Sequence, residues 1–398
     1  MFFLNYTIIF SFFICNTWEQ RKLKDVVDFL DTMRKPLEGA KRIPGPYPYY
    51  GASGIVDYVD GYLFDEELVL LSEDGANITD RNYPVCFLAS GKYWVNNHAH
   101  VLRTKDGNEN NFICNSLERK DYKQYNSGMA MPKLNKEVCQ SIPISCPRFD
   151  EQKKIGDYFR NLDHLITLHQ RKCDDTKELK KYMLQKMFPK NGEKFPEIRF
   201  KGFTEAWEQR KLSELLYLSS ERNDGSYTRD DVLAASLGTE LQKKHIYFGL
   251  RATDESVKNY KVVLPNDVIY TKSPIKGFPN GIIRTSKGEN GIVPTLYCVY
   301  HSIDVINPSI IQAYFESKER LDAYLIPLVN IGARNNVNIT DKEFLEGAIC
   351  IPKDKAEQDK IVDVLERLSN LITLHQRKCD TLKELKKYML QNMFPKKG

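Results

Sequence analysis

The chain has 398 residues, of which 41% are hydrophobic and 28% charged, a composition typical of folded globular proteins that excludes the disordered and fibrous classes. This length allows two or three domains. The 58 basic and 53 acidic residues leave a formal charge of +5, too small for a domain that is basic throughout, so any surface that binds nucleic acid must be local.

Residues 1–17, MFFLNYTIIFSFFICNT, form an apolar leader. The run lacks a positively charged start and a small-x-small cleavage site, and it is shorter than the roughly 20 residues of a membrane-spanning helix. We interpret it as translated upstream sequence or a displaced start, with membrane contact as the alternative, and expect no membrane among the partners.

The stretch from residue 18 begins with WEQRKL and continues into short β-prone runs, broken by Gly, Asn and Asp, across residues 49–102. These runs predict a mixed α+β domain with much exposed loop. Within it, NNHAH places His98 and His100 two apart, which on a strand aims both at one face and would suit two ligands of a metal ion. No third ligand has a clear spacing, so we interpret both as structural or hydrogen-bonding histidines and expect no metal site.

A long helix with one narrow apolar seam is predicted over residues 151–187. No glycine or proline interrupts residues 157–188, and the FP pair ends the helix because proline disfavours helix in the residue before it. Alternating steps of four and three residues are the spacing of a surface that packs on another helix. The seam residues that we expect to pair are Leu162, Ile166, His169 and Cys173.

The second half repeats this order, because WEQRKL returns at residues 207–212 and a second long helix follows more β-prone runs. The segment that begins ITLHQRKCD differs between residues 166–189 and 372–395 at only three of 24 positions. The first motif repeats at an offset of 189 and the second at an offset of 206, so constant ends enclose two segments with little similarity. The expected seam residues of the second helix are Leu368, Ile372, His375, Cys379 and Leu382.

We therefore predict an α+β fold with two domains and two long helices that pair as an antiparallel coiled coil, related by a pseudo-twofold internal repeat. A helix on the order of 55 Å long with one narrow seam cannot bury itself on a small domain, so its twin is the obvious partner. The alternative is two unrelated amphipathic helices, each packed on its own domain. The expected boundaries are 1–17 for the leader, 18–146 for the first domain, 147–190 for the first long helix, 191–206 for a linker, 207–352 for the second domain and 353–398 for the second long helix.

The sequence lacks motifs for catalysis and for cofactor binding. It holds no G-x-x-x-x-G-K-[ST] loop for ATP, no glycine fingerprint for a dinucleotide or methyl donor, and no N-P-P-aromatic loop for an amine. Nine cysteines stand singly, without a C-x-x-C pair, which argues against a zinc cage or a disulfide framework and is typical of a reducing cytoplasm. We predict no catalytic residues, no metal and no cofactor bound by this chain.

The loops instead contain residue types that commonly contact DNA. Arg and Asn hydrogen-bond bidentately to guanine and adenine edges, while Lys and Ser hold phosphates. The alternative for any single residue is a solvated loop, but for the basic turn IYTKSPIKGFPNGIIRTSKG as a unit we favour DNA. The candidate DNA-binding residues are Tyr50, Ser53, Asn77, Arg81, Lys92, Asn96 and His98 in the first half, and Lys272, Ser273, Lys276, Arg284, Lys287, Arg334, Asn335 and Asn336 in the second.

WEQRKL opens each half, a predicted long helix closes each half, and four segments lie between them: YGASGIVDYVDGYLFD, WVNNHAHVL, KSPIKGFPNGII and ARNNVNI. On the basis of these features, the chain resembles the DNA specificity subunit of a type I restriction–modification system over residues 18–398. The resemblance implies two target-recognition domains, each reading one half of a bipartite, asymmetric DNA site, and helices that dock two modification subunits. It also implies that S-adenosylmethionine, ATP and Mg²⁺ belong to partner subunits, which methylate adenine at N6 or cut DNA. The expected partners are double-stranded DNA, two modification subunits and, through them, restriction subunits, all in the cytoplasm.

Two other functions stay open at this point. A self-sufficient nuclease or methyltransferase is disfavoured by the missing donor and amine motifs, and a coiled-coil adaptor without a DNA role leaves the basic turns unexplained. The sequence also departs from the family, in which a lead like the FPEIRFKGFTEA before the second WEQRKL normally precedes the first as well; here residues 1–17 stand in its place.

Overall fold

The computed structural model describes residues 18–190, 192–235, 242–243, 254–275, 277–328, 330–331 and 337–395. The chain divides into two compact units. The first consists of Met1–Leu168 and Cys379–Gly398, and the second of His169–Lys378. Each of the two long helices therefore contributes one part to each unit.

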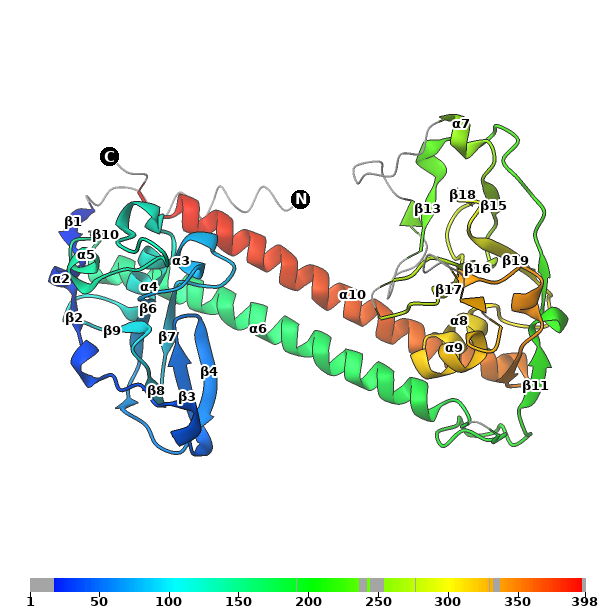
Figure 1. Ribbon diagram of the computed structural model, residues 1–398, viewed down its shortest axis with the longest axis horizontal. Coiled ribbons are helices and arrows are strands. Elements are labelled where there is room, and N and C mark those ends of the chain that lie inside the picture. The colour runs from blue at the N-terminus through cyan, green and yellow to red at the C-terminus, as the bar shows by residue number, and fades with distance from the viewer. Residues whose placement is uncertain are drawn as a thin grey trace. The chain divides into compact units, whose positions relative to one another are not determined.

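A four-stranded antiparallel sheet lies at the centre of the first unit (Figure 1). Its strands, in order across the sheet, are β2 (Val27–Phe29), β9 (Ala99–Thr104), β6 (Leu68–Ser72) and β7 (Cys86–Ala89). Every residue of β6 is buried, because helix α4 (Asn110–Glu118) packs on one face of this sheet and a second sheet lies against the other. A strand covered on both faces needs an unbroken apolar run, which LVLL supplies.

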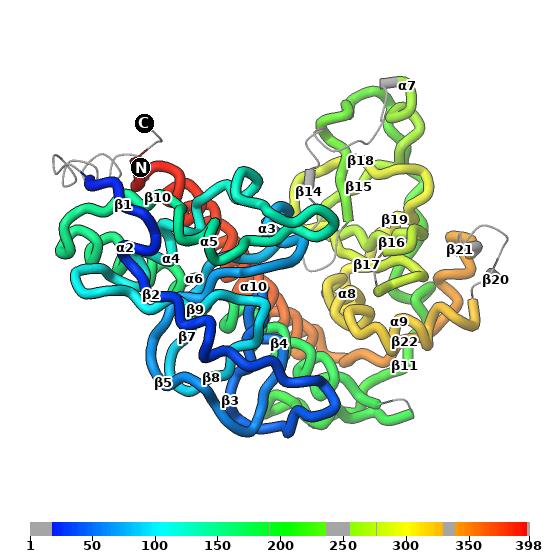
Figure 2. Tube along the Cα trace, turned by 60° about the vertical axis from the view of Figure 1, so that its left-hand side comes forward, coloured from blue at the N-terminus to red at the C-terminus, as the bar shows by residue number. Residues whose placement is uncertain are grey.

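The second sheet of this unit contains one parallel pair and is visible in Figure 2. Its order is β4 (Gly54–Val59), β3 (Pro44–Gly51), β8 (Lys92–Val95) and β5 (Phe64–Asp65). Side chains of β6 alternate between the two neighbouring layers: Leu68 and Leu70 pack with β5 and β8, whereas Val69 and Leu71 join the core around α4.

The second unit repeats the central sheet and its covering helix. The sheet order is β12 (Leu216–Leu218), β19 (Cys298–Ser302), β16 (Val268–Thr271) and β17 (Ile282–Thr285). Helix α8 (Ser309–Phe315) contacts β16 and β17, as α4 contacts β6 and β7, and α9 (Lys318–Leu325) follows it. The smaller strands are β13 (Leu233–Ala234) with β14 (Gln242–Lys243), β15 (Lys261–Val263) with β18 (Gly291–Val293), and β20 (Asn330–Ile331) with β21 (Val337–Asn338).

Short elements complete the two units. In the first they are α2 (Leu23–Val26), η1 (Asp31–Met33), η2 (Gly39–Lys41), α3 (Asn77–Asp80), η3 (Tyr122–Tyr125) and α5 (Lys136–Gln140). In the second they are η4 (Leu212–Glu214), η5 (Arg229–Asp231), α7 (Asp254–Val257) and η6 (Glu343–Leu345).

The repeated WEQRKL motif forms the same local structure twice. In the first unit β1 (Glu19–Lys22) pairs antiparallel with β10 (Pro143–Cys146), and in the second β11 (Glu208–Lys211) pairs antiparallel with β22 (Ala348–Ile351). Each pair joins the start of a half to the residues just before its long helix. The constant ends that the sequence shows therefore meet in space around the variable segment.

The two long helices are α6 (Phe149–Lys186) and α10 (Lys355–Asn392). They confirm the expected long helices, and the α+β class and internal repeat are confirmed as well. Within the described ranges, none of the helices is both long enough and apolar enough to cross a membrane.

Candidate functional site

The ends of the long helices pack on the tryptophans that open the two halves. In the second unit Phe188, just after α6, makes an edge contact with Trp207 at 5.7 Å between ring centroids. In the first unit Phe394, just after α10, makes the same kind of contact with Trp18 at 6.0 Å. Both phenylalanines are buried. In each unit, therefore, the phenylalanine of the repeated FP motif packs on the tryptophan of the repeated WEQRKL motif.

A Glu-Gln pair stands near the start of each long helix, at residues 151–152 and 357–358, and its glutamine ties the helix to the variable segment. Gln152 accepts a hydrogen bond from the backbone N–H of Glu109 (3.1 Å) and donates one to the Pro147 carbonyl (3.0 Å). Gln358 makes the equivalent pair, accepting from the Asn307 N–H at 2.9 Å and donating to the Pro352 carbonyl at 2.8 Å. Both side chains are buried, so each amide satisfies a backbone donor and a backbone acceptor that water cannot reach.

Within the second unit, the two long helices contact each other through predicted seam residues. The rings of His169 and His375 meet with 3.0 Å between their Nδ1 atoms, so one ring donates and the other accepts. Burial and the positive charges of His375 and nearby lysines lower the pKa of His169. The Cys173 thiol lies 3.7 Å from the Ile372 carbonyl oxygen. Leu368, one helical turn before Ile372, is buried.

Within the first unit, the other ends of the same helices also touch. Leu162 is buried, and the Cys379 thiol lies 3.9 Å from the Ile166 carbonyl oxygen. Lys386 forms a 2.6 Å ion pair with Asp163. Leu382 packs against the first unit's core.

The order of these contacts is antiparallel in each unit. In the second unit, Lys180 of α6 hydrogen-bonds Ser369 of α10, while the earlier His169 meets the later His375. In the first unit Asp163 pairs with Lys386, and the later Ile166 meets the earlier Cys379. Contacts in register every turn along both helices would make this a coiled coil, which stays a prediction.

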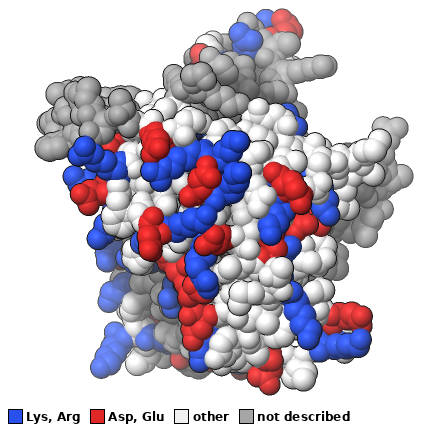
Figure 3. Space-filling view, turned by 90° about the vertical axis from the view of Figure 1, so that its left-hand side faces the viewer, with Lys and Arg blue, Asp and Glu red and all other residues white. Residues whose placement is uncertain are grey.

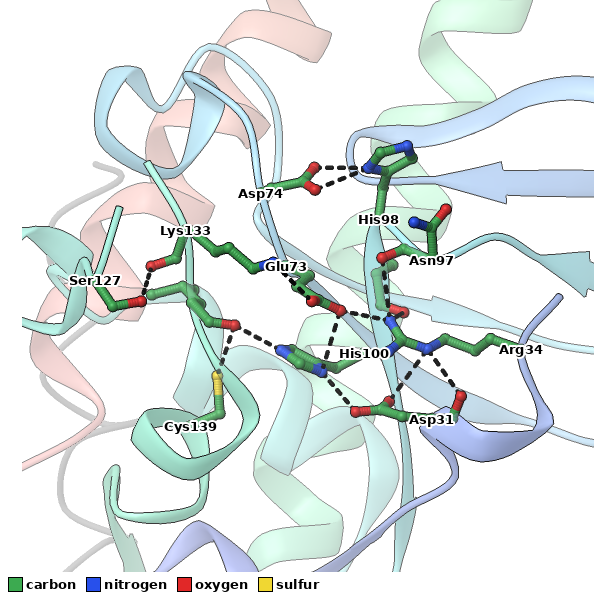
Figure 4. A network of polar contacts seen from close by, with 12 residues as sticks. Asp31, Arg34, Glu73, Asp74, Asn97, His98, His100, Ser127, Lys133 and Cys139 are labelled. Atoms are coloured by element: carbon green, nitrogen blue, oxygen red, sulfur yellow. Dashed lines mark hydrogen bonds and ion pairs between the residues drawn. The ribbon is translucent and has the colours of Figure 1, made fainter. Parts of the chain in front are cut away.

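Among the first-unit candidates, His98 lies in the turn before β9 rather than on the strand, and its ring bonds Asp74 at 2.8 Å. His100 is 1% exposed at the centre of a polar network (Figure 4). Its Nδ1 donates to Asp31 (2.8 Å) and its Nε2 to the Leu134 carbonyl (2.7 Å). The interpretation of both rings as hydrogen-bonding histidines is confirmed.

Two acidic residues organise the rest of this network. Glu73 forms ion pairs with Arg34 at 2.7 Å and with Lys133 at 3.6 Å. Asp31 accepts a further hydrogen bond from the Val101 N–H at 3.1 Å. Figure 4 shows that these side chains converge from separate parts of the chain on the end of β9. Their combined effect is to fix the loop that contains Lys133 to the central sheet.

Other first-unit candidates have structural partners. Asn77 donates to the Tyr83 carbonyl at 3.0 Å and accepts from the Tyr83 N–H at 2.8 Å. Arg81, with a left-handed backbone (φ 57°), forms a 2.9 Å ion pair with Glu118. Each of these contacts stabilises a loop. Asn77 and Arg81 could therefore bind DNA only by giving up contacts that stabilise the fold.

The remaining first-unit candidates lie on the second sheet. Tyr50 stacks on Phe87 at 5.8 Å, and Asn96 is buried with its side chain accepting from the His98 N–H at 2.8 Å. Ser53 lies exposed in the turn between β3 and β4, and the exposed Lys92 lies over the Tyr62 ring. Ser53 and Lys92 are accessible to a ligand, whereas Tyr50 and Asn96 support the fold.

In the second unit, the expectation that Arg284 lies on an exposed turn is wrong. Arg284 belongs to β17, is 4% exposed and donates to the Ile283 carbonyl, and burial lowers its pKa. Lys272 forms a 2.8 Å ion pair with Asp341, and Lys287 pairs with Glu366. GIIRTS is one of the β-prone runs of the second half, and all four residues of β17 are buried, so the strand carries Arg284 into the core rather than onto a turn.

The other second-unit candidates are less constrained by the structure. Ser273 is half-buried in a bend just after β16. Lys276, Arg334, Asn335 and Asn336 lie outside the described residues.

Sequence reasoning missed one exposed loop, residues 127–133, which we call the methionine loop. Met129 is fully exposed and Met131 is 59% exposed. The Asn126 side chain accepts hydrogen bonds from the N–H groups of Gly128 and Lys133, both at 2.9 Å. An SG pair followed by a proline marks the turn in the sequence, but methionine gives no polar signal of function.

Charge is mixed on the face of the first unit that Figure 3 shows, where Lys and Arg are interspersed with Asp and Glu. No group of three or more His, Cys, Asp or Glu side chains in the described ranges is arranged to hold a metal ion. The cysteines within those ranges are all free thiols.

Comparisons with known proteins agree on one family. Residues 16–178 match the family model described as type I restriction modification DNA specificity domain. A putative type I restriction enzyme specificity subunit from Haemophilus influenzae is 37% identical over 137 residues, which cover 34% of this chain and 35% of that protein. The type I restriction enzyme MjaVIII specificity subunit from Methanocaldococcus jannaschii is 22% identical over 217 residues, covering 51% of this chain and 50% of the relative. The matches thus span about a third and a half of these relatives.

Among solved structures, the S subunit of a type I restriction-modification system from M. genitalium has a TM-score of 0.67 at 12% identity. The match covers 96% of this chain and 97% of that chain, and it extends the likeness in fold to both halves.

Proposed function

We propose that the chain is a member of the family of type I restriction–modification specificity subunits, that it reads DNA sequence for partner enzymes, and that it has no catalytic activity of its own. The observation that carries this proposal is the repeated frame, in which the same tryptophan contact, strand pair and buried glutamine enclose two different variable segments. A constant scaffold around a variable segment would allow DNA-recognition segments of different specificity to be exchanged without loss of the fold.

The proposed target is a bipartite, asymmetric DNA site. Each unit would read one half-site through its variable loops, because the two variable segments differ while their scaffolds are alike. The accessible candidates are Ser53 and Lys92 in the first unit and Ser273 in the second. Lys276, Arg334, Asn335 and Asn336 remain proposed contacts on the basis of the sequence.

The proposed protein partners are two modification subunits, with restriction subunits joining through them. Two copies of one partner need two equivalent docking surfaces, and the near-identical segments 166–189 and 372–395 supply a repeated one. S-adenosylmethionine, ATP and Mg²⁺ would then be held by those partners, which would methylate adenine at N6 and cut DNA.

The test is co-purification of the full chain with a modification subunit encoded beside it, followed by mapping of methylated adenines in genomic DNA. We expect methylation at one bipartite sequence with the complex and none with the chain or the partner alone. Robust methylation by the rigorously purified chain would overturn the proposal, and so would a complex that methylates without sequence preference.

A further inference from the structure

The methionine loop is closed by hydrogen bonds and presents two apolar side chains to solvent. Ser127 closes it, because its N–H donates to the Lys133 carbonyl at 2.8 Å and its hydroxyl donates to the same oxygen at 3.0 Å. The Gly75 N–H donates to the Pro132 carbonyl at 3.0 Å and fixes the loop to a neighbouring segment. A Cβ added to Gly128 would overlap the Met131 carbonyl oxygen, so this tight shape requires glycine.

Single exposed apolar side chains are common on proteins, but here two exposed methionines stand two residues apart on one loop that hydrogen bonds close, and together they form a small apolar surface. Met129 is fully exposed, and Met131 is 59% exposed beside it. A loop that is closed by Asn126 and Ser127 loses little further entropy when it binds a ligand. The construction is that of a preformed contact surface.

The internal repeat identifies the equivalent position in the second unit. An offset of 205 relates the buried Leu134 to the buried Ile339, and it also relates the first residue of β10 to the first residue of β22. The same offset maps Met129 onto Arg334 and Met131 onto Asn336. Residues 334 and 336 lie outside the described residues, so the correspondence is one of sequence position.

The side chains at these matched sequence positions differ in chemistry, since the first half has methionines and the second half has arginine and asparagine. Docking of two identical protein partners would call for the same chemistry in both places. Reading of two different half-sites calls for different chemistry in the same place. The difference therefore favours DNA bases over a protein partner as the ligand of this loop.

We propose that Met129 and Met131 determine specificity in the first half-site by apolar contact with the 5-methyl group of thymine in duplex DNA. In the major groove this methyl group is the one apolar feature that distinguishes a base pair by sequence, and apolar side chains recognise it by contact. The inference rests on the proposed function, because it names the base feature that one unit reads.

The test uses the complex of the full chain with its modification subunit and the bipartite sequence that methylation mapping defines. Each thymine of both half-sites is replaced in turn by deoxyuridine, which lacks the methyl group and keeps the hydrogen-bonding edge. We expect at least one replacement in one half-site to weaken binding by the native complex about fourfold, the value of one buried methyl group. The M129A/M131A complex should bind both duplexes equally.

Two further variants control the experiment. Met33→Ala removes an exposed methionine from another part of the same unit (47% exposed) and should keep the native response to deoxyuridine. Gly128→Ala keeps both methionines but forces the tip to move, and it should lose the response as the double variant does.

The outcomes separate the two proposals. If no defined sequence is methylated, the proposed function itself fails and the inference fails with it. If a sequence is defined but deoxyuridine has no effect, or has the same effect in M129A/M131A, only the inference is overturned. Loss of the modification subunit from the folded M129A/M131A protein would also overturn it, in favour of protein docking.

Discussion

At the scale of single residues, His100 shows how a buried side chain acquires a fixed protonation state. Both of its ring nitrogens donate hydrogen bonds, one to the Asp31 carboxylate and one to a backbone carbonyl, which requires the imidazolium form. Burial alone would lower the pKa of His100, but the hydrogen bond to Asp31 and the contact with Cys139 outweigh it and raise the pKa to about 10. The charge is compensated inside the network.

This protonation makes the stability of the first unit depend on pH. The unfolded ring titrates near 6.5 and the folded ring near 10, so the contribution is complete below about 6.5 and is lost as pH rises through about 10. We expect His100→Gln to lower the free energy of unfolding by about 2 kcal/mol at pH 6.5, because buried Asp31 loses a charged hydrogen-bond donor and keeps the Val101 N–H and the more distant Arg34 at 3.6 Å. The variant should lose less stability than the native protein between pH 6.5 and 10. Urea unfolding followed by circular dichroism measures both.

His98→Gln is the matched control, since its ring is about half exposed and bonds Asp74 at the surface. It should keep the native dependence on pH. An unchanged dependence in His100→Gln would assign the effect to the lysines and tyrosines that also titrate near pH 10.

At the scale of elements, the first turn of each long helix is locked by one glutamine. Gln152 and Gln358 each bridge a proline carbonyl before the helix and a backbone N–H of the variable segment. This is why EQ recurs while the segments around it change: the amide recognises backbone and is indifferent to neighbouring side chains.

Replacing either glutamine with alanine should cost about 2 kcal/mol, because two buried backbone groups lose their partners. Gln152→Ala should destabilise the first unit and Gln358→Ala the second, as seen by hydrogen exchange of each central sheet. Gln170→Ala, which removes hydrogen bonds to Asp174 on the helix surface, should change the free energy of unfolding by less than about 0.5 kcal/mol. Equal effects of all three would show that the bridges add little.

At the scale of the whole molecule, the sequence predicts periodic features better than long-range ones. The four-and-three spacing around Leu162 and Ile372 predicted both long helices. The repeat of WEQRKL marked the start of each half, but the strands that it forms were not predicted. The candidate site was harder to predict. Lys272 looked like a phosphate contact, but its partner Asp341 is 69 residues away and no local pattern links them.

The contact between Trp18 and Phe394 repeats the one between Trp207 and Phe188, which makes the order of the two halves interchangeable. A permuted chain that runs from residue 190 to 395, through a copy of residues 190–206, and then from 18 to 189 keeps every one of these contacts. We expect its free energy of unfolding to lie within about 1 kcal/mol of that of the native chain, because only the entropy of loop closure changes.

In the permuted chain, Phe394→Ala should lower the free energy of unfolding of the first unit by about 3 to 5 kcal/mol, the usual effect of truncating a buried phenylalanine. Differential scanning calorimetry distinguishes the two results. A permuted chain that melts like the Phe394→Ala variant would show that the two tryptophan contacts are not equivalent.

The sharing of helices between the units also has a consequence for synthesis on the ribosome. The core of the first unit contains Met389 and Phe394, which are translated only after the whole of the second unit, His169–Lys378. At 5 to 20 residues per second, Phe112 and Phe159 wait roughly 12 to 56 s for Phe394 to emerge. The half that is made first is therefore the half that is finished last, and until then its unfilled apolar surface is a substrate for chaperones.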